Sequence, residues 1–95
     1  MSSPTAPEAK ASGFQGQVPS IAEVVSEIIG SLALAAHAYM DEASGAGDLA
    51  SAEVAIDVAS LAFDRIRERL GAERRLAIAQ LLTETRLAYV RRREA

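Results

Sequence analysis

The fold is decided by residues 48–70, which read DLASAEVAIDVASLAFDRIRERL. Apolar residues recur there at alternating steps of three and four, which is the period of one face of an α-helix. Asp48 is a suitable N-cap, because its side chain can accept a hydrogen bond from a free backbone N–H group, and Gly71 supplies a C-terminal stop. The pattern runs without a break and predicts a helix over 48–70 with this buried stripe: Leu49, Ala52, Ile56, Ala59, Phe63, Ile66 and Leu70.

Another helix is predicted over 20–42. Ser20 and Glu23 have the spacing of a capping box, in which each side chain can bond the backbone N–H of the other residue. The Gly-rich stretch 44–47 ends this helix. Its apolar residues form one predicted core face and a second set that widens this face: Ile21, Val25, Ile28, Leu32, Ala35 and Tyr39, then Val24, Ile29, Ala36 and Met40.

The remainder of the chain contains a third predicted helix, over 72–92, and an N-terminal tail. Residues 1–19 are rich in Ser, Pro, Ala and Gly without periodicity, so we expect a disordered tail followed by one helical domain, 20–95. Short connections favour antiparallel neighbours. The predicted fold is therefore all-α, an antiparallel helical hairpin plus a third helix, forming a three-helix bundle that oligomerisation completes. The residues of the third helix that are predicted to face the core are Ile78, Leu82, Thr85 and Tyr89.

Composition excludes several classes of function. The chain has 95 residues and no cysteine, which removes disulfides and thiolate metal sites. Its aromatic fraction is 4% and its net charge is −3, a poor basis for stacking on bases or attracting phosphate. The N-terminus lacks the basic start and apolar stretch of a secretory signal. We expect a cytoplasmic protein with no cofactor.

The helix over 20–42 carries the prediction about partners. It is apolar nearly all round from residue 28 to residue 40, and a helix of that kind is buried on several sides or lies in a membrane. That run is shorter than the roughly 20 apolar residues of a membrane span, so we expect protein around it. Two helices cannot easily enclose a third, which favours a homo-oligomer; an unidentified second protein is the alternative. The predicted interface is Ala22, Ser26, Ile29, Gly30, Ala36 and Met40.

Ala22, Ser26 and Gly30 form a strip of small residues at every fourth position of that helix. Small residues let two backbones approach closely. The strip could therefore receive another helix of the same chain, or it could help to form the contact between subunits. The sequence alone leaves these two interpretations open.

The same segments resemble a known family. Ser31, Leu32 and Ala33 match a Ser-Leu-Ala start to an Ala-rich helix, and a Asp-Leu-x-x-Ala-x-x-x-Ile-Asp pattern and an Arg-x-x-Tyr-Val ending follow. On these motifs the chain resembles DUF1844, a small bacterial family of unknown function, over about residues 21–90. It departs from the family at 68–71, where many relatives carry Gly-Asn-Leu-Thr. The other matching residues are Asp48, Leu49, Ala52, Ile56, Asp57, Arg86, Tyr89 and Val90.

No catalytic or metal-binding constellation is evident in the sequence. His37 is the only histidine, and Leu34 stands where a Glu-x-x-His metal pair would need its glutamate. The acidic row along the helix over 48–70 indicates a solvated face or an ion-pair seam with the third helix. Asp57 and Arg86 lie beside core positions of adjacent helices and are the predicted structural ion pair.

Arginines gather in two clusters, one around the turn between the second and third helices and one at the C-terminus. Both clusters can be explained by structure alone: the arginines balance the acidic residues of the chain, and a positive charge is favourable at the C-terminal end of a helix. The alternative is an RNA- or ribosome-associated accessory protein that uses these clusters on phosphate, although nucleic-acid binders are usually basic as a whole. We therefore predict a non-enzymatic, self-associating module for protein–protein interaction. The clusters are Arg65, Arg67, Arg69, Arg74 and Arg75, and then Arg91, Arg92 and Arg93.

Overall fold

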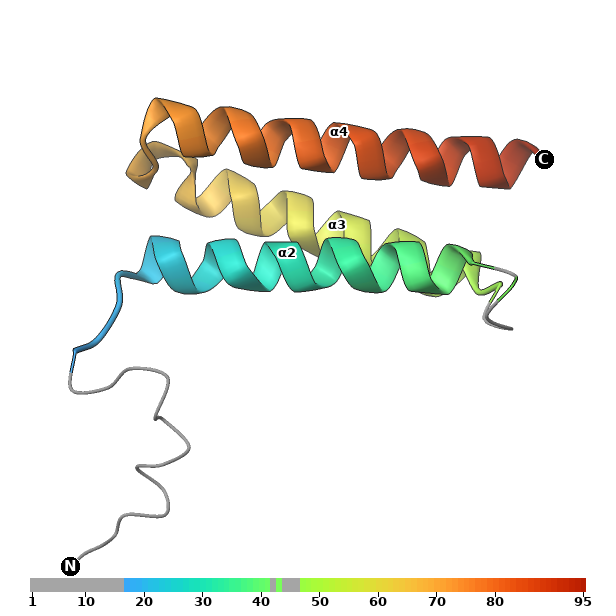
Figure 1. The fold of residues 1–95 in the computed structure, drawn as a ribbon, viewed down its shortest axis with the longest axis horizontal. Helices are drawn as coiled ribbons and strands as arrows, with labels where there is room; N and C mark the ends of the chain where they lie inside the picture. Colours follow the sequence, from blue (N-terminus) through green and yellow to red (C-terminus); the bar gives the residue numbers. More distant parts are fainter. Residues whose placement is uncertain (1–16, 42, 44–46) are drawn as a thin grey trace, which may run out of the picture.

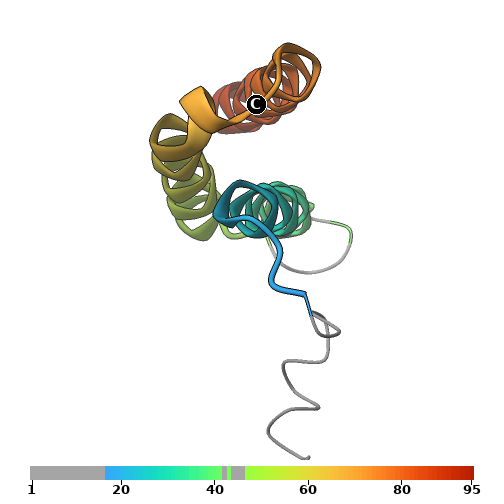
Figure 2. The same ribbon diagram turned by 90° about the vertical axis from the view of Figure 1, so that its left-hand side faces the viewer.

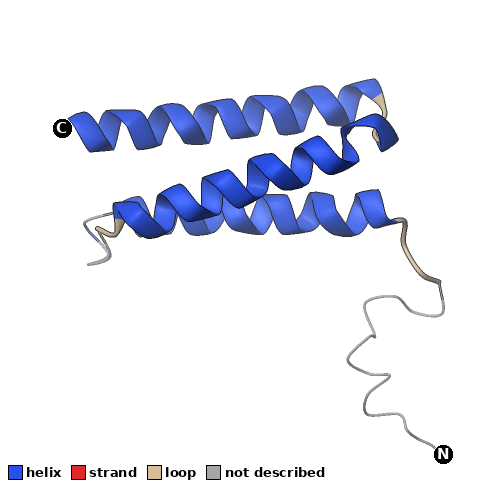
Figure 3. Ribbon diagram, turned by 180° about the vertical axis from the view of Figure 1, so that it is seen from behind, coloured by secondary structure: helices blue, strands red, loops and turns tan. Residues whose placement is uncertain are grey.

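The computed structural model describes residues 17–41, 43 and 47–95, and most of the predicted tail lies outside these residues. The described chain contains helices and no strand (Figures 1 and 3). The helical elements are α2 (Ile21–Met40), α3 (Leu49–Ile66), the short 3₁₀ turn η3 (Arg67–Arg69) and α4 (Ala72–Glu94). The all-α prediction and the packing of three helices are thereby confirmed.

Hydrogen bonds from side chains fix where the hairpin helices begin. Ser20 Oγ accepts a bond of 3.1 Å from the Glu23 amide, which caps α2. Asp48 accepts bonds of 3.0 Å from the Ser51 amide and 2.6 Å from the Ser51 hydroxyl. The hydroxyl bond, followed by the amide bond, holds the pKa of the Asp48 carboxyl below its usual value. Gly47 enters this cap at a φ of 47°, a left-handed conformation that favours glycine.

The helix ends differ from their predicted positions by a few residues. α2 ends at Met40 instead of residue 42, and Asp41 follows in an extended conformation. The helix predicted to reach residue 70 ends at Ile66, and the chain tightens into η3 before Leu70. α4 continues to Glu94, two residues beyond the predicted end at 92. Helix ends commonly fray or tighten in this way.

The α2–α3 hairpin is the main packing unit, and α4 packs less extensively against both of its helices. Seen along the helices in Figure 2, α3 lies between α2 and α4, and the three form an open arc. One core cluster centres on Ile29, Phe63 and Leu82, while a second joins Ala36 and Met40 to the start of α3.

The core stripe predicted for α3 is confirmed. Of the seven residues predicted for the stripe over 48–70, six are buried and Leu49 is half-buried. The stripe predicted for α2 is confirmed only in part, because three of its six residues face solvent, while Ile29, Ala36 and Met40 of the set predicted to widen it are buried. On α2, Ile21, Ile28 and Tyr39 face solvent. A helix that is apolar on nearly every side has no single face for periodicity to select. The residues of α2 that are buried instead are Ala22, Ile29, Ala33, Ala36 and Met40.

The new core face of α2 consists largely of alanine, and so does the part of α3 that it meets. Ala36 lies in one cluster with Ala52 and Ala55, and Ala22 lies in another with Ala59. Small side chains on both sides allow two helices to pack at the short end of the usual 8–10 Å separation. Alanines from both helices therefore form a large part of the contact that buries this face of α2.

A candidate interaction surface

The predicted interface residues lie mostly inside the chain. Ala22, Ile29, Ala36 and Met40 are buried by the other helices, and Ser26 and Gly30 are half-buried. The Ser26 hydroxyl is buried without a hydrogen-bond partner among the described residues. At Gly30 a Cβ would meet no atom within 4 Å, so no neighbouring helix requires a glycine there. Packing within the chain therefore occupies most of the predicted interface.

Large apolar side chains are exposed on the outer side of the hairpin. Val54, Val58 and Leu61 follow one another along α3 at steps of four and three, which places them on one stripe. On α2, Ile21 and Ile28 are two turns apart and Tyr39 continues the same side. All six side chains are between 39% and 65% exposed. We call these six residues the hairpin face: Ile21, Ile28, Tyr39, Val54, Val58 and Leu61.

A shallow apolar groove of about 380 Å³ joins the two stripes of the hairpin face. The half-buried Leu32 and Ala35 form its α2 side, and Ala55 lies across from them on α3. Tyr39 and Val54 of the hairpin face both line this groove, so the two stripes meet there. The residues that line the groove are Leu32, Ala35, Tyr39, Ala50, Ser51, Val54 and Ala55.

The hairpin face points away from α4. Two contacts show where α4 sits: His37 Nε2 lies 3.4 Å from Thr85 Oγ1, and Ser60 Oγ accepts a bond of 2.9 Å from Arg86 Nη2. Ala35 precedes His37 by two positions and Val58 precedes Ser60 by two. Residues two apart on a helix point about 160° from one another. The third helix of the chain therefore leaves this face uncovered.

The predicted ion pair is brought together on the α4 side of the hairpin. Arg86 Nη1 lies 3.9 Å from Asp57 Oδ1, and the side chains are 50% and 58% exposed. The shorter bond of the same guanidinium goes to the Ser60 hydroxyl. An exposed pair at this separation stabilises by about 0.2–1 kcal/mol. Arg86 thus ties α4 to α3 without a buried charge.

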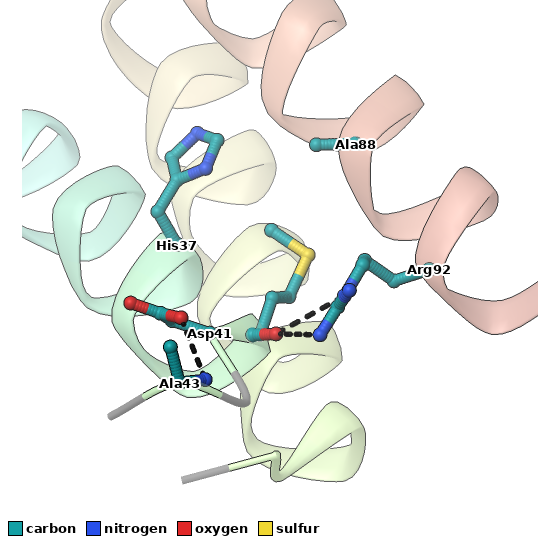
Figure 4. A pocket seen from close by; sticks show the side chains of 6 residues that line it. His37, Asp41, Ala43, Ala88 and Arg92 are labelled. Atoms are coloured by element: carbon teal, nitrogen blue, oxygen red, sulfur yellow. Dashed lines mark hydrogen bonds between the residues drawn. The ribbon is translucent and has the colours of Figure 1, made fainter. Parts of the chain in front are cut away.

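His37 lines a polar opening between α2 and α4 (Figure 4). The Thr85 hydroxyl beside it donates to the Leu81 carbonyl at 2.8 Å. Arg92 reaches across from α4 and donates two hydrogen bonds, of 3.1 and 2.8 Å, to the Met40 carbonyl at the end of α2. These bonds connect α4 to the C-terminal end of α2. Among the described residues no group of three or more His, Asp and Glu side chains could hold a metal ion.

The arginine clusters lie at the two ends of α4, about 35 Å apart along a helix of 23 residues. Several of their members contact the chain itself. Arg67 donates to Asp64 at 2.7 Å and stacks over Phe63, and Arg75 donates to the Leu70 carbonyl at 3.0 Å. The two clusters do not combine into one basic surface.

Helix α2 is long and apolar enough to cross a membrane, judged by length and composition alone. Its 20 residues include an 18-residue stretch with a mean hydropathy of 1.5, of which 22% is buried inside the molecule. The core helix of a soluble protein or a signal sequence meets the same criterion. The finding is therefore weak evidence, and the absence of a membrane partner stays a prediction.

The chain matches no known family model, no curated protein and no solved structure. The resemblance to DUF1844 consequently stays a prediction.

Proposed function

We propose that the protein is a non-enzymatic, self-associating helical module, and that its hairpin face packs against the same face of a second copy. The observation that supports this proposal is the set of six exposed apolar side chains on one side of the hairpin, beside a core that the chain has already closed. Monomeric proteins rarely expose a patch of a few hundred Å² or more without a use for it. A cytoplasmic location belongs to the same proposal.

The dimensions of the hairpin face suit a dimer. Helices of 18 to 20 residues are about 30 Å long. Two such helices packed side by side, each about 10 Å across, present roughly 30 by 20 Å, or ~600 Å². A standard protein–protein interface buries about 800 Å² on each partner. The face therefore approaches this size before any rim residue is counted.

The chemistry of the face favours a second copy over an unrelated protein. A two-fold contact brings the same patch of both subunits together, so the patch must be complementary to itself. The stripes of the hairpin face contain one charged residue, Arg65, which follows Leu61 by one turn at the end of α3. An apolar surface of this kind needs no opposite charge on its partner and can pack against its own copy.

The RNA- or ribosome-associated alternative has less support. Beyond Arg67 and Arg75, three more arginines of the clusters and the ion pair contact their own chain. Arg86 and Arg92 do so by hydrogen bonds, and Arg93 lies over the Tyr89 ring. Five arginines are therefore in contact with their own chain, whereas no other part of the described chain covers the hairpin face.

The test is the molecular mass of the full chain across a dilution series, measured by sedimentation velocity. We expect a dimer that dissociates on dilution. Ile28→Glu places a charge in the hairpin face and should give a folded monomer, whereas Leu34→Glu should leave the dimer intact. Leu34 is the matched control, because it is 74% exposed and lies about 120° around the same helix from Ile28, outside the hairpin face. A folded wild-type monomer at every concentration overturns the proposal, and so does equal dissociation by both variants.

Lipid is the other apolar surface that this face could meet. Flotation with phosphatidylcholine vesicles tests it on the same three proteins. We expect all three to stay in the soluble fraction. Binding of the wild type that Ile28→Glu abolishes and Leu34→Glu preserves would assign the hairpin face to a bilayer and overturn the dimer.

A further inference from the structure

We infer that the two copies pack about a two-fold axis perpendicular to the helices, so that α3 lies antiparallel on α3 of the partner copy and the two Val58 side chains meet at the axis. This inference rests on the proposed self-association and adds its geometry. It follows from the alignment of the two stripes of the hairpin face, from the groove between them and from the one cation on that face.

The two stripes of the hairpin face have their middles at the same level of the hairpin. Where the hairpin turns, the Asp48 amide donates a hydrogen bond of 2.7 Å to the Tyr39 carbonyl, which aligns the two antiparallel helices. Counting nine residues back along α2 and nine onward along α3 reaches Gly30 and the position just before Val58, because both helices rise equally per residue. Gly30 is midway along the α2 stripe, and Val58 is the middle residue of the α3 stripe.

Two two-fold axes can lie in the plane between facing hairpins, and both preserve this common middle level. An axis perpendicular to the helices places each helix on the same helix of the partner copy and inverts the levels. Leu61 then lies over Val54 of the partner copy, and Val58 lies over Val58. An axis parallel to the helices keeps the levels and exchanges the helices, so that α3 lies over α2 of the partner copy.

The groove of the hairpin face favours the perpendicular axis. It lies between the two helices in the half of the hairpin that is near the turn, where small side chains such as Ala35 and Ala55 line it. The parallel axis places groove over groove and leaves both unfilled, which forfeits packing contacts. The perpendicular axis inverts the levels, so that Ile28 of one copy lies over Leu32 of the other, at the wall of the groove.

Arg65 is the residue that the parallel axis accommodates poorly. It is exposed and follows Leu61 by one turn at the end of the α3 stripe. The parallel axis would place it on the first turns of α2 of the partner copy, against Ile21 and Val24. Glu23 is at that level but lies about 160° around α2 from Ile21, outside the contact. The guanidinium would then lose water without gaining an acceptor, at a cost in free energy.

The perpendicular axis leaves the same guanidinium in water. Arg65 lies seven residues after Val58, and Ala50 lies eight residues before it, so Arg65 of one copy lies over Ala50 of the other. Ala50 is the second residue of α3, and its small side chain is exposed. The aliphatic stem of Arg65 can pack on this alanine while the charged end extends past the start of the helix.

Single cysteines distinguish the two axes, because the sequence contains none. On mild oxidation Val58→Cys should cross-link to itself, whereas a mixture of Leu61→Cys and Ile28→Cys should give no mixed disulfide. The parallel axis predicts the reverse, because Leu61 then lies over Ile28 of the partner copy and the two α3 helices are at least a helix diameter apart. Leu34→Cys, outside the hairpin face, measures random collision. If Val58→Cys is a dimer by sedimentation and does not cross-link to itself, the inference is overturned.

A new charge at Ala50 tests the contact with Arg65 by sedimentation equilibrium at low salt. Ala50→Glu should lower the dissociation constant of the dimer about fivefold, because it places an acid opposite Arg65 of the partner copy twice by symmetry. The gain should disappear when Arg65→Ala is present, and this comparison also cancels any effect of the new acid on α3 alone. With the parallel axis the two positions are far apart, so additive effects would contradict the inference. Circular dichroism establishes that each variant is folded.

The failure of this inference can be told apart from that of the proposed function. If Ile28→Glu dissociates the dimer while Val58→Cys fails to cross-link to itself, self-association stands and the perpendicular axis is wrong. If the wild type is monomeric at every concentration, the proposed function itself fails and the geometry with it.

Discussion

Two neighbouring isoleucines of α2 provide a direct test of which side of the helix forms the core. Ile29 is fully buried, whereas Ile28 is 47% exposed on the hairpin face. Ile29→Ala removes three carbons, worth about 0.8 kcal/mol each in lost burial. The cavity that remains raises the loss to ~3–4 kcal/mol. A chain of this size has a free energy of unfolding of only about 5–14 kcal/mol, so the variant should be severely destabilised.

Ile28→Ala removes the same three carbons from a side chain that already contacts water. The lost burial within one copy is then roughly 1 kcal/mol, and the better helix propensity of alanine offsets part of it. The expected difference between the two variants is therefore ~2 kcal/mol or more. Because chemistry and helix position are closely matched, burial is the main quantity that differs between them.

The measurement is urea unfolding followed by circular dichroism, at the lowest protein concentration that gives a signal. Low concentration removes the contribution of association, which would otherwise add a penalty for Ile28→Ala. An unchanged slope against urea would show that both variants report on the same transition. Equal destabilisation, or a larger effect of Ile28→Ala, would refute the burial of Ile29 and restore the stripe that periodicity predicts.

Three smaller perturbations test contacts at the helix ends and between helices. Asp57→Ala and Arg86→Ala in a double-mutant cycle should show a coupling of about 0.2–1 kcal/mol, and a larger value would mean that the pair is buried. Arg92→Ala should destabilise by ~1–2 kcal/mol, because the Met40 carbonyl loses two charged donors; unchanged urea unfolding would contradict this role. The lowered pKa of Asp48 means that its stabilising effect is present above its unfolded pKa and is lost as the pH falls through the lower folded value. Asp48→Asn should remove this loss of stability at acid pH. If the stability of the variant has the same pH dependence as that of the wild type, the charge of the cap contributes nothing.

The sequence predicts the number and order of the helices because their signals are local. Asp48 caps α3 where expected. The apolar row from Leu49 to Leu70 keeps its helical spacing without a break. Of the two apolar rows on α3, the longer one, from Leu49 to Leu70, is the one that faces the core. The sequence predicts the ends of the helices less accurately. The 3₁₀ turn η3, for example, depends on how the chain turns into α4.

The candidate surface could not be located by the same reasoning. Periodicity finds apolar positions, but on α2 such positions occur on nearly every side, and the pattern does not rank Ile28 against Ile29. The choice depends on which face the alanines of α3 can approach closely, and that is a property of two helices together. The hairpin face had a signal in the sequence, the row Val54, Val58 and Leu61 on α3, which the stronger stripe beside it obscures.

The division of side chains within the hairpin itself supports the proposal of association. Between α2 and α3 the chain buries six alanines beside five large side chains, and it leaves Ile28, Leu61 and Val54 outside. Burying alanine removes little apolar area from water, whereas each large side chain on the outside would contribute about 1.5–3 kcal/mol if it were fully covered. A hairpin that served only as the core of one copy would gain more by placing its large residues inward. Large apolar residues on the outside as well as the inside suit a hairpin that forms one layer and provides the face for a second.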